Sequence, residues 1–206
     1  GATWSPKNDG FYYGRYDKPS KEFALKALNQ NQKIYFHRIN SSQSDDLLIY
    51  ERPDHPEWGF STSVTEDGRY LIIYQSEGTQ PKKRIFIKDL SKSNASVTPF
   101  LDQFDASYEI IGNIQDTFFV LTSNSAPRNR LVAISLSNPE PNKWKTILEE
   151  DSKGSILQDV TFINHQFVAQ VMTDAKTSSF SAFSSISSIA TTFTSVSANS
   201  DVRIMV

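Results

Sequence analysis

A repeated unit of 49 residues constrains the fold of this chain more than any other feature. A short hairpin signal recurs at Asp67-Gly68, Gln115-Asp116 and Asn164-His165, with 49 residues from Asp67 to Asp116 and again from Asp116 to His165. Each signal precedes a short run of β-branched and aromatic residues, such as Tyr70-Leu71-Ile72-Ile73-Tyr74, which is typical of a strand. An earlier copy, Asp9-Gly10, stands 58 residues before Asp67 because a polar insert lengthens the first unit. The chain is therefore predicted to repeat one supersecondary unit.

Each complete unit is expected to hold four antiparallel strands. In the stretch Gly59 to Leu90, Ser61 to Thr65 precedes the hairpin and Arg84 to Ile87 follows the next loop. The third strand recurs at 33–36 and 130–133, and a closing strand is predicted at 47–50, 97–100 and 144–148. Four strands at this period predict an all-β fold, a partial β-propeller of about three and a half blades. The one short helical pattern, 23–28, is too short for a parallel βαβ crossover.

The predicted domain boundaries follow from a change in composition near residue 176. We expect a partial β-propeller over 1–175, a Ser/Thr/Phe-rich insert or loop over 176–200, and a resumed but truncated blade strand over 201–206. From Thr177 to Ser200 the chain carries no charge, and its apolar residues follow neither helical nor strand spacing. Arg203 then repeats the start of the third strand, about 27 residues later than the period requires.

Composition excludes several functional classes. The formal net charge of -2 argues against a nucleic-acid footprint, which needs a clustered basic face. The absence of Cys excludes thiolate metal sites and thiol nucleophiles, and no apolar run is long enough to span a membrane. Because the chain starts at Gly1, we expect a processed or excised segment. The compartment stays open, with cytoplasm or periplasm as the alternatives.

No catalytic motif is present, and we expect no catalytic residue, cofactor or metal in this chain. The three histidines are His37, His55 and His165. His55 lies among acidic residues and prolines, so a metal or acid–base cluster is one interpretation and an inter-blade loop is the favoured one. His37 is expected to face a neighbouring strand, and His165 to occupy a turn. The tryptophans are interpreted as blade-packing aromatics, with an exposed functional role left open for Trp58.

Several motifs in order resemble the propeller of prolyl oligopeptidases. They are Tyr50 to Trp58, Asp67 to Tyr70, Ser76 to Pro81, Phe104 to Tyr108, and Ala126 to Leu131, and the similarity runs from about Trp4 to Asp174. Members of that family are serine peptidases that cut short peptides after proline. The resemblance implies that this chain is a non-catalytic segment that gates oligopeptide access to the active site of a hydrolase domain absent from this chain. The 177–200 stretch departs from the family pattern.

The resemblance also implies three residues that line the substrate pocket: Gly59, Ser76 and Thr79. Gly59 lacks the bulky apolar contact of some members and Ser76 lacks their cationic contact, whereas Thr79 keeps a small polar group. The implied partners are the hydrolase domain of the same parent chain and proline-containing oligopeptides, with self-association through unclosed propeller edges. The alternative is an autonomous β-propeller that binds a protein partner.

Overall fold

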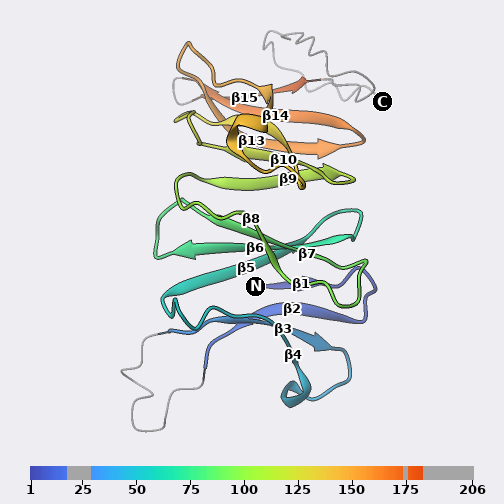
Figure 1. Cartoon of the computed structure of the whole chain (residues 1–206). Coiled ribbons are helices and arrows are strands. Elements are labelled where there is room, and N and C mark those ends of the chain that lie inside the picture. The colour runs from blue at the N-terminus through green and yellow to red at the C-terminus, as the bar shows by residue number, and fades with distance from the viewer. Residues whose placement is uncertain (18–28, 174–175, 183–206) are drawn as a thin grey trace. The chain divides into compact units, whose positions relative to one another are not determined.

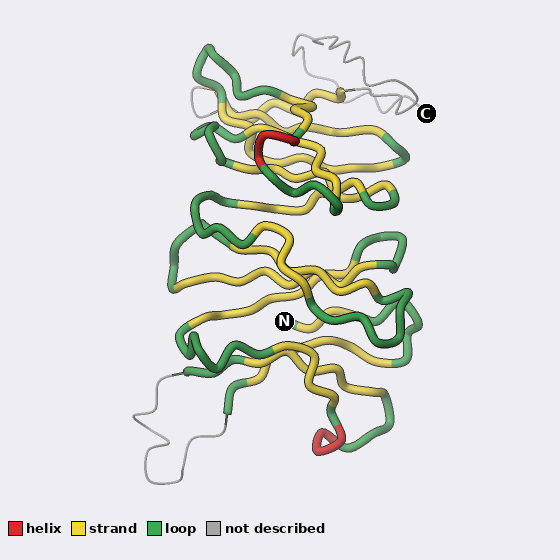
Figure 2. Tube along the Cα trace, in the orientation of Figure 1, coloured by secondary structure: helices red, strands yellow, loops and turns green. Residues whose placement is uncertain are grey.

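The computed structural model describes residues 1–17, 29–173 and 176–182, the last range as backbone only (Figure 1). The chain divides into two compact units, Gly1–Tyr108 and Glu109–Val206. Strands dominate both units, and Figure 2 shows short 3₁₀ turns as the helical pieces of the described residues. In these residues no helix has the length and hydropathy to cross a membrane.

The first unit contains two antiparallel four-stranded sheets whose strands follow the sequence order. Sheet A consists of β1 (Ala2–Trp4), β2 (Gly10–Arg15), β3 (Lys33–Arg38) and β4 (Leu47–Tyr50), with a 3₁₀ turn, η1 (Gln43–Asp45), before β4. Sheet B consists of β5 (Trp58–Val64), β6 (Tyr70–Glu77), β7 (Arg84–Asp89) and β8 (Thr98–Leu101). In both sheets the short fourth strand pairs with a β-bulge, which limits the length of its free edge.

The second unit repeats this arrangement. Sheet C consists of β9 (Tyr108–Ile114), β10 (Thr117–Thr122), β11 (Arg130–Ser135) and β12 (Lys145–Leu148), with η2 (Pro141–Lys143) before β12. Sheet D consists of β13 (Ile156–Ile163), β14 (Gln166–Thr173) and β15 (Lys176–Ala182). The all-β fold of repeated antiparallel blades is therefore confirmed, with three four-stranded sheets and one three-stranded sheet in the described residues.

The hairpin turns lie where the sequence period places them. Gly68 has a φ of 70°, and Gln115, Asn164 and His165 also have positive φ, as tight turns between twisted strands require. In the first of these turns the hydroxyl of Thr65 accepts a hydrogen bond from Tyr70 N at 2.9 Å. These turns set the register that carries alternate side chains into the core.

Each unit buries its own apolar core between its two sheets. In the first unit, sheets A and B contribute the buried side chains Tyr12, Ile34, Trp58, Phe60, Leu71, Ile73 and Phe86. In the second unit, sheets C and D contribute Phe119, Leu121, Leu131, Leu157, Val160, Phe167 and Ala169. The near-continuous apolar runs of β6 and β10 are explained by burial on both faces.

Two sequence predictions differ from the structure. Residues 177–182 are not an insert, because β15 pairs along β14 from Thr173↔Lys176 to Phe167↔Ala182 and so supplies the third strand of sheet D. Its alternation of Ser/Thr with Phe and Ala suits a strand, although it lacks the Arg-Ile start of the other third strands. Trp4 is 61% exposed rather than packed between blades.

Three further predictions fall outside the described residues. These are the short helical pattern at 23–28, the rest of the expected insert over 183–200, and the resumed strand at 201–206.

Candidate functional site

The three residues implied to line a pocket lie at one end of sheet B. Gly59 on β5 is the direct cross-strand partner of Ser76 on β6, and the Ser76 hydroxyl donates a hydrogen bond to the Gly59 carbonyl at 3.4 Å. Thr79 follows the end of β6 and is exposed in the β6–β7 loop. The structure therefore brings Gly59 and Ser76 together and holds Thr79 three residues further along the same hairpin.

Two polar side-chain ends lie close to Gly59. A Cβ atom at this position would lie 3.1 Å from the Ser76 Oγ and 3.6 Å from the Gln32 Oε1. The same Gln32 side chain accepts a hydrogen bond from Phe60 N at 2.6 Å, so the residue just before β3 is joined to the first strand of sheet B. A bulky side chain at position 59 would need both polar neighbours to move.

Trp58 anchors the same end of sheet B. Its ring is 6% exposed, and the His55 imidazole stacks on it with centroids 3.9 Å apart and an interplanar angle of 2°. The guanidinium carbons of Arg52 and Arg84 lie 4.5 and 4.7 Å from its centroid. Cation–π contacts of this kind stabilise a partly desolvated arginine by about 0.5–2 kcal/mol. Trp58 is therefore a packing residue, as favoured from the sequence.

An open groove of about 330 Å³ runs beside Trp58 between the outer strands of sheets A and B. It is lined by Tyr50, Arg52, Trp58, Arg84, Phe86, Val97, Pro99 and Asp102. Arg52 donates from Nε and Nη2 to the two carboxylate oxygens of Asp54, each at 2.8 Å. The hydrogen bonds from Arg52 hold the pKa of Asp54 at about 2. This pairing orders the β4–β5 connection, where the sequence predicted an inter-blade loop.

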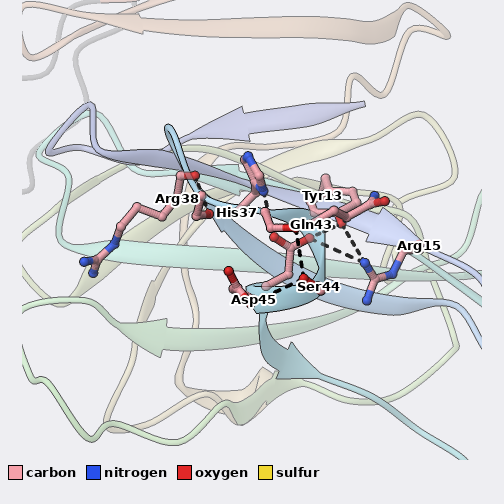
Figure 3. A network of polar contacts seen from close by, with 10 residues as sticks. Tyr13, Arg15, His37, Arg38, Gln43, Ser44 and Asp45 are labelled. Carbon is pink, nitrogen blue, oxygen red and sulfur yellow. Dashed lines mark hydrogen bonds and ion pairs between the residues drawn. The ribbon is translucent and has the colours of Figure 1, made fainter.

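A second polar cluster covers one face of sheet A (Figure 3). The Asp46 carboxylate, whose side chain is fully buried, accepts hydrogen bonds from the Tyr13 hydroxyl and from His37 Nδ1 at 2.7 Å. Arg15 Nη1 lies 3.5 Å from the same carboxylate and its guanidinium carbon lies 3.8 Å from the Tyr35 centroid. Burial alone would raise the pKa of Asp46, but the hydrogen bonds from Tyr13 and His37 outweigh it and lower that pKa.

Sequence reasoning did not find this cluster, although it placed His37 opposite a neighbouring strand. His37 does pair with Phe11, and the two rings lie 5.1 Å apart. The available signal was the alternation of Phe11, Tyr13 and Arg15 along β2, which puts three large side chains on one face. Asp46 directly follows η1, and no pattern in the sequence predicted its contacts with Tyr13 and His37.

Comparison with known proteins decides the family. The family described as prolyl oligopeptidase, N-terminal beta-propeller domain, matches residues 1–185. The chain belongs to the prolyl oligopeptidase family. It is 32% identical over 177 residues to prolyl oligopeptidase A of Amanita bisporigera, covering 82% of this chain and 23% of that protein. It is 33% identical over 153 residues to the prolyl endopeptidase of Elizabethkingia miricola, covering 74% of this chain and 21% of that protein.

The solved structures agree with the propeller of the prolyl oligopeptidase family. Prolyl oligopeptidase B from Galerina marginata, bound to a 35mer hydrolysis and macrocyclization substrate, matches with a TM-score of 0.79 and 26% identity. That match covers 88% of this chain and 25% of the Galerina chain. This chain thus spans about a quarter of the length of the relatives it matches. Residues 1–185 match the N-terminal beta-propeller domain of that family.

Proposed function

We propose that this chain gates the access of oligopeptides to the active site of a prolyl oligopeptidase-type serine peptidase. The active site would belong to an α/β-hydrolase domain of the same parent polypeptide, with which the propeller segment would pack. The observation that carries this proposal is the family match over 1–185, which includes strands of both compact units. The substrates would be proline-containing oligopeptides, in keeping with the peptide-bound Galerina relative.

Within this function, Gly59, Ser76 and Thr79 would face the bound peptide. Their placement at one end of sheet B supports the assignment, because a pocket needs its contacts on one surface. The Thr79 hydroxyl is exposed and can both donate and accept a hydrogen bond, whereas the Ser76 hydroxyl already donates to Gly59. Thr79 would therefore make the direct polar contact, and Gly59 would leave space beside it.

A chimeric enzyme tests this assignment. Residues 1–185 would replace the matching segment of the Amanita prolyl oligopeptidase A, and Thr79→Trp would be compared with Ser93→Trp. Ser93 is an exposed hydroxyl residue of the same sheet, in the β7–β8 loop, which leaves the sheet at the end opposite to the β6–β7 loop. We expect Thr79→Trp to raise KM for a proline-containing peptide about tenfold, because the bulky ring fills the proposed contact surface. Equal KM values for the two variants would remove Thr79 from the pocket.

A further inference from the structure

Arg84 joins both strands of the β6–β7 hairpin and the segment that follows β8. It is the first residue of β7, and its Nη1 donates to Gln75 Oε1 at 2.7 Å and to Glu77 Oε1 at 2.5 Å. Its Nε donates to the Asp102 carbonyl at 2.9 Å. Gln75 is fully buried on β6, and Glu77 is the last residue of that strand. One guanidinium therefore fixes the two strands directly below the loop that carries Thr79.

Aromatic rings hold the same guanidinium in place. The Arg84 guanidinium carbon lies 4.7 Å from the Trp58 centroid and 4.8 Å from the Phe104 centroid. The Arg84 side chain is 20% exposed, so most of its surface is shielded from water. Such burial requires several well-aligned partners, which the planar fork of an arginine can satisfy at once and a lysine cannot.

The basic residues at the same repeat position of sheets A and C make looser contacts. Lys33, which begins β3, donates to the two carboxylate oxygens of the exposed Asp17 at 2.8 and 3.1 Å and lies 3.7 Å from the exposed Glu51. Arg130, which begins β11, lies 3.5 Å from Asn124 Oδ1 and 5.9 Å from the Trp144 centroid. Hydrogen bonds that join this basic residue to a fully buried side chain of the neighbouring strand are thus a feature of Arg84 in sheet B, where the proposed pocket residues lie.

We propose that Arg84 is a positioning residue that fixes the β6–β7 hairpin and so holds Ser76 and Thr79 in one pose toward a bound peptide. The role of the pocket in this inference rests on the proposed function. The effect of Arg84 on the mobility of the β6–β7 hairpin can be measured independently of that function. Gly78 has a φ of 57°, and residues 78–81 are exposed. Because a short exposed loop with few packing contacts opens locally at low free energy, its order depends on the strands at its base.

The lack of Cys in the chain makes a direct measurement possible. Thr79→Cys carries a single nitroxide label, and its mobility is followed by electron paramagnetic resonance in the Arg84→Gln, Arg84→Lys and Arg69→Gln backgrounds. Arg69 is the matched control because it lies at the opposite end of sheet B, just before β6. Its Nη2 lies 3.7 Å from Asp89 Oδ2. We expect Arg84→Gln to free the label and to speed amide exchange of residues 76–83 at least tenfold. Arg84→Lys should lie between, since it keeps the charge beside Glu77 but loses the fork.

Unchanged exchange at the centres of β6 and β7 confirms that the variants stay folded. If Arg84→Gln does not fold, Glu77→Gln removes the ion pair alone and should free the label partially. Label mobility in Arg84→Gln equal to that in Arg69→Gln would overturn the proposal.

The functional part of the inference is read in the chimeric enzyme. Arg84→Gln should raise KM several-fold at constant kcat, with partial rescue by Arg84→Lys, because the peptide contacts are displaced and the catalytic groups are not. An unchanged KM with a freed label would show that Arg84 holds the hairpin but that peptide binding does not depend on this hold. That result would refute the positioning role. It would leave the assignment of the pocket standing if Thr79→Trp raises KM tenfold, and the pocket would be refuted as well if Thr79→Trp also leaves KM unchanged.

Discussion

Replacing Asp46 by Asn should destabilise the first unit by about 2 kcal/mol at neutral pH. The buried carboxylate accepts hydrogen bonds from Tyr13 and His37, and hydrogen bonds to charged groups contribute about 1.5–3 kcal/mol each. The amide of Asn keeps the shape and one acceptor but loses the charge, so about one such interaction is lost. Asp45→Asn is the matched control, because Asp45 is exposed and accepts only from Ser44 at 3.3 Å among the described hydrogen bonds.

The effect should depend on pH in a defined direction. The folded chain lowers the pKa of Asp46, so its contribution to stability is present above the ordinary carboxyl pKa of about 3.9. This contribution is lost as the pH falls through the lower pKa of the folded state. The difference in unfolding free energy between the native chain and Asp46→Asn should therefore be constant near neutral pH and shrink in acid.

Urea titration monitored by tryptophan fluorescence measures this difference. A Trp144→Phe background removes the tryptophan of the second unit, so that the signal reports Trp4 and Trp58 in the first. An unfolding free energy for Asp46→Asn equal to that for Asp45→Asn at neutral pH would refute the structural argument. A difference that grows in acid would refute the assigned direction of the pKa shift.

Two further predictions concern buried and exposed apolar residues. Ile73→Ala should lower the free energy of unfolding by about 3–4 kcal/mol, because Ile73 is fully buried between sheets A and B. Ile163→Ala, at a residue 59% exposed, should lower it by under about 1 kcal/mol, and calorimetry of the two variants checks this. The purified chain is expected to self-associate through the face of sheet A that exposes Trp4 (61%) and Leu48 (48%). The double variant Trp4→Ser, Leu48→Ser should therefore have a smaller mass by light scattering, and an unchanged mass would contradict this.

The strands were predictable because each hairpin has a local signal. Asp67-Gly68 favours a tight turn with a positive φ at Gly68, and the apolar run from Tyr70 onward favours a buried strand. The closing strands at 47–50 and 145–148 also lie within a residue of their predicted bounds. These features depend on neighbours in the sequence, which a single sequence displays.

The misses depend on contacts between distant residues. β15 was assigned to an insert because Ser-rich strands carry a weak hydrophobic pattern, and pairing with β14 decides the outcome. The cluster around Asp46 forms because η1 returns over sheet A, which no local pattern encodes. The pairing of Gly59 with Ser76 followed from the predicted hairpin, but the contact with Gln32 depends on how sheets A and B pack.

The gating of substrate size is tested most directly in the chimeric enzyme that carries residues 1–185. The measurement is kcat/KM for three substrates with the same proline-containing cleavage sequence: a free oligopeptide, a folded protein with the sequence in a loop, and the same protein with the sequence in a flexible terminus. If this segment restricts access, cleavage of the oligopeptide should persist and the folded protein should be cleaved at least a hundredfold more slowly. The substrate with the cleavage sequence in a flexible terminus controls for the local accessibility of that sequence. Equal kcat/KM for all three substrates would contradict the proposed gating.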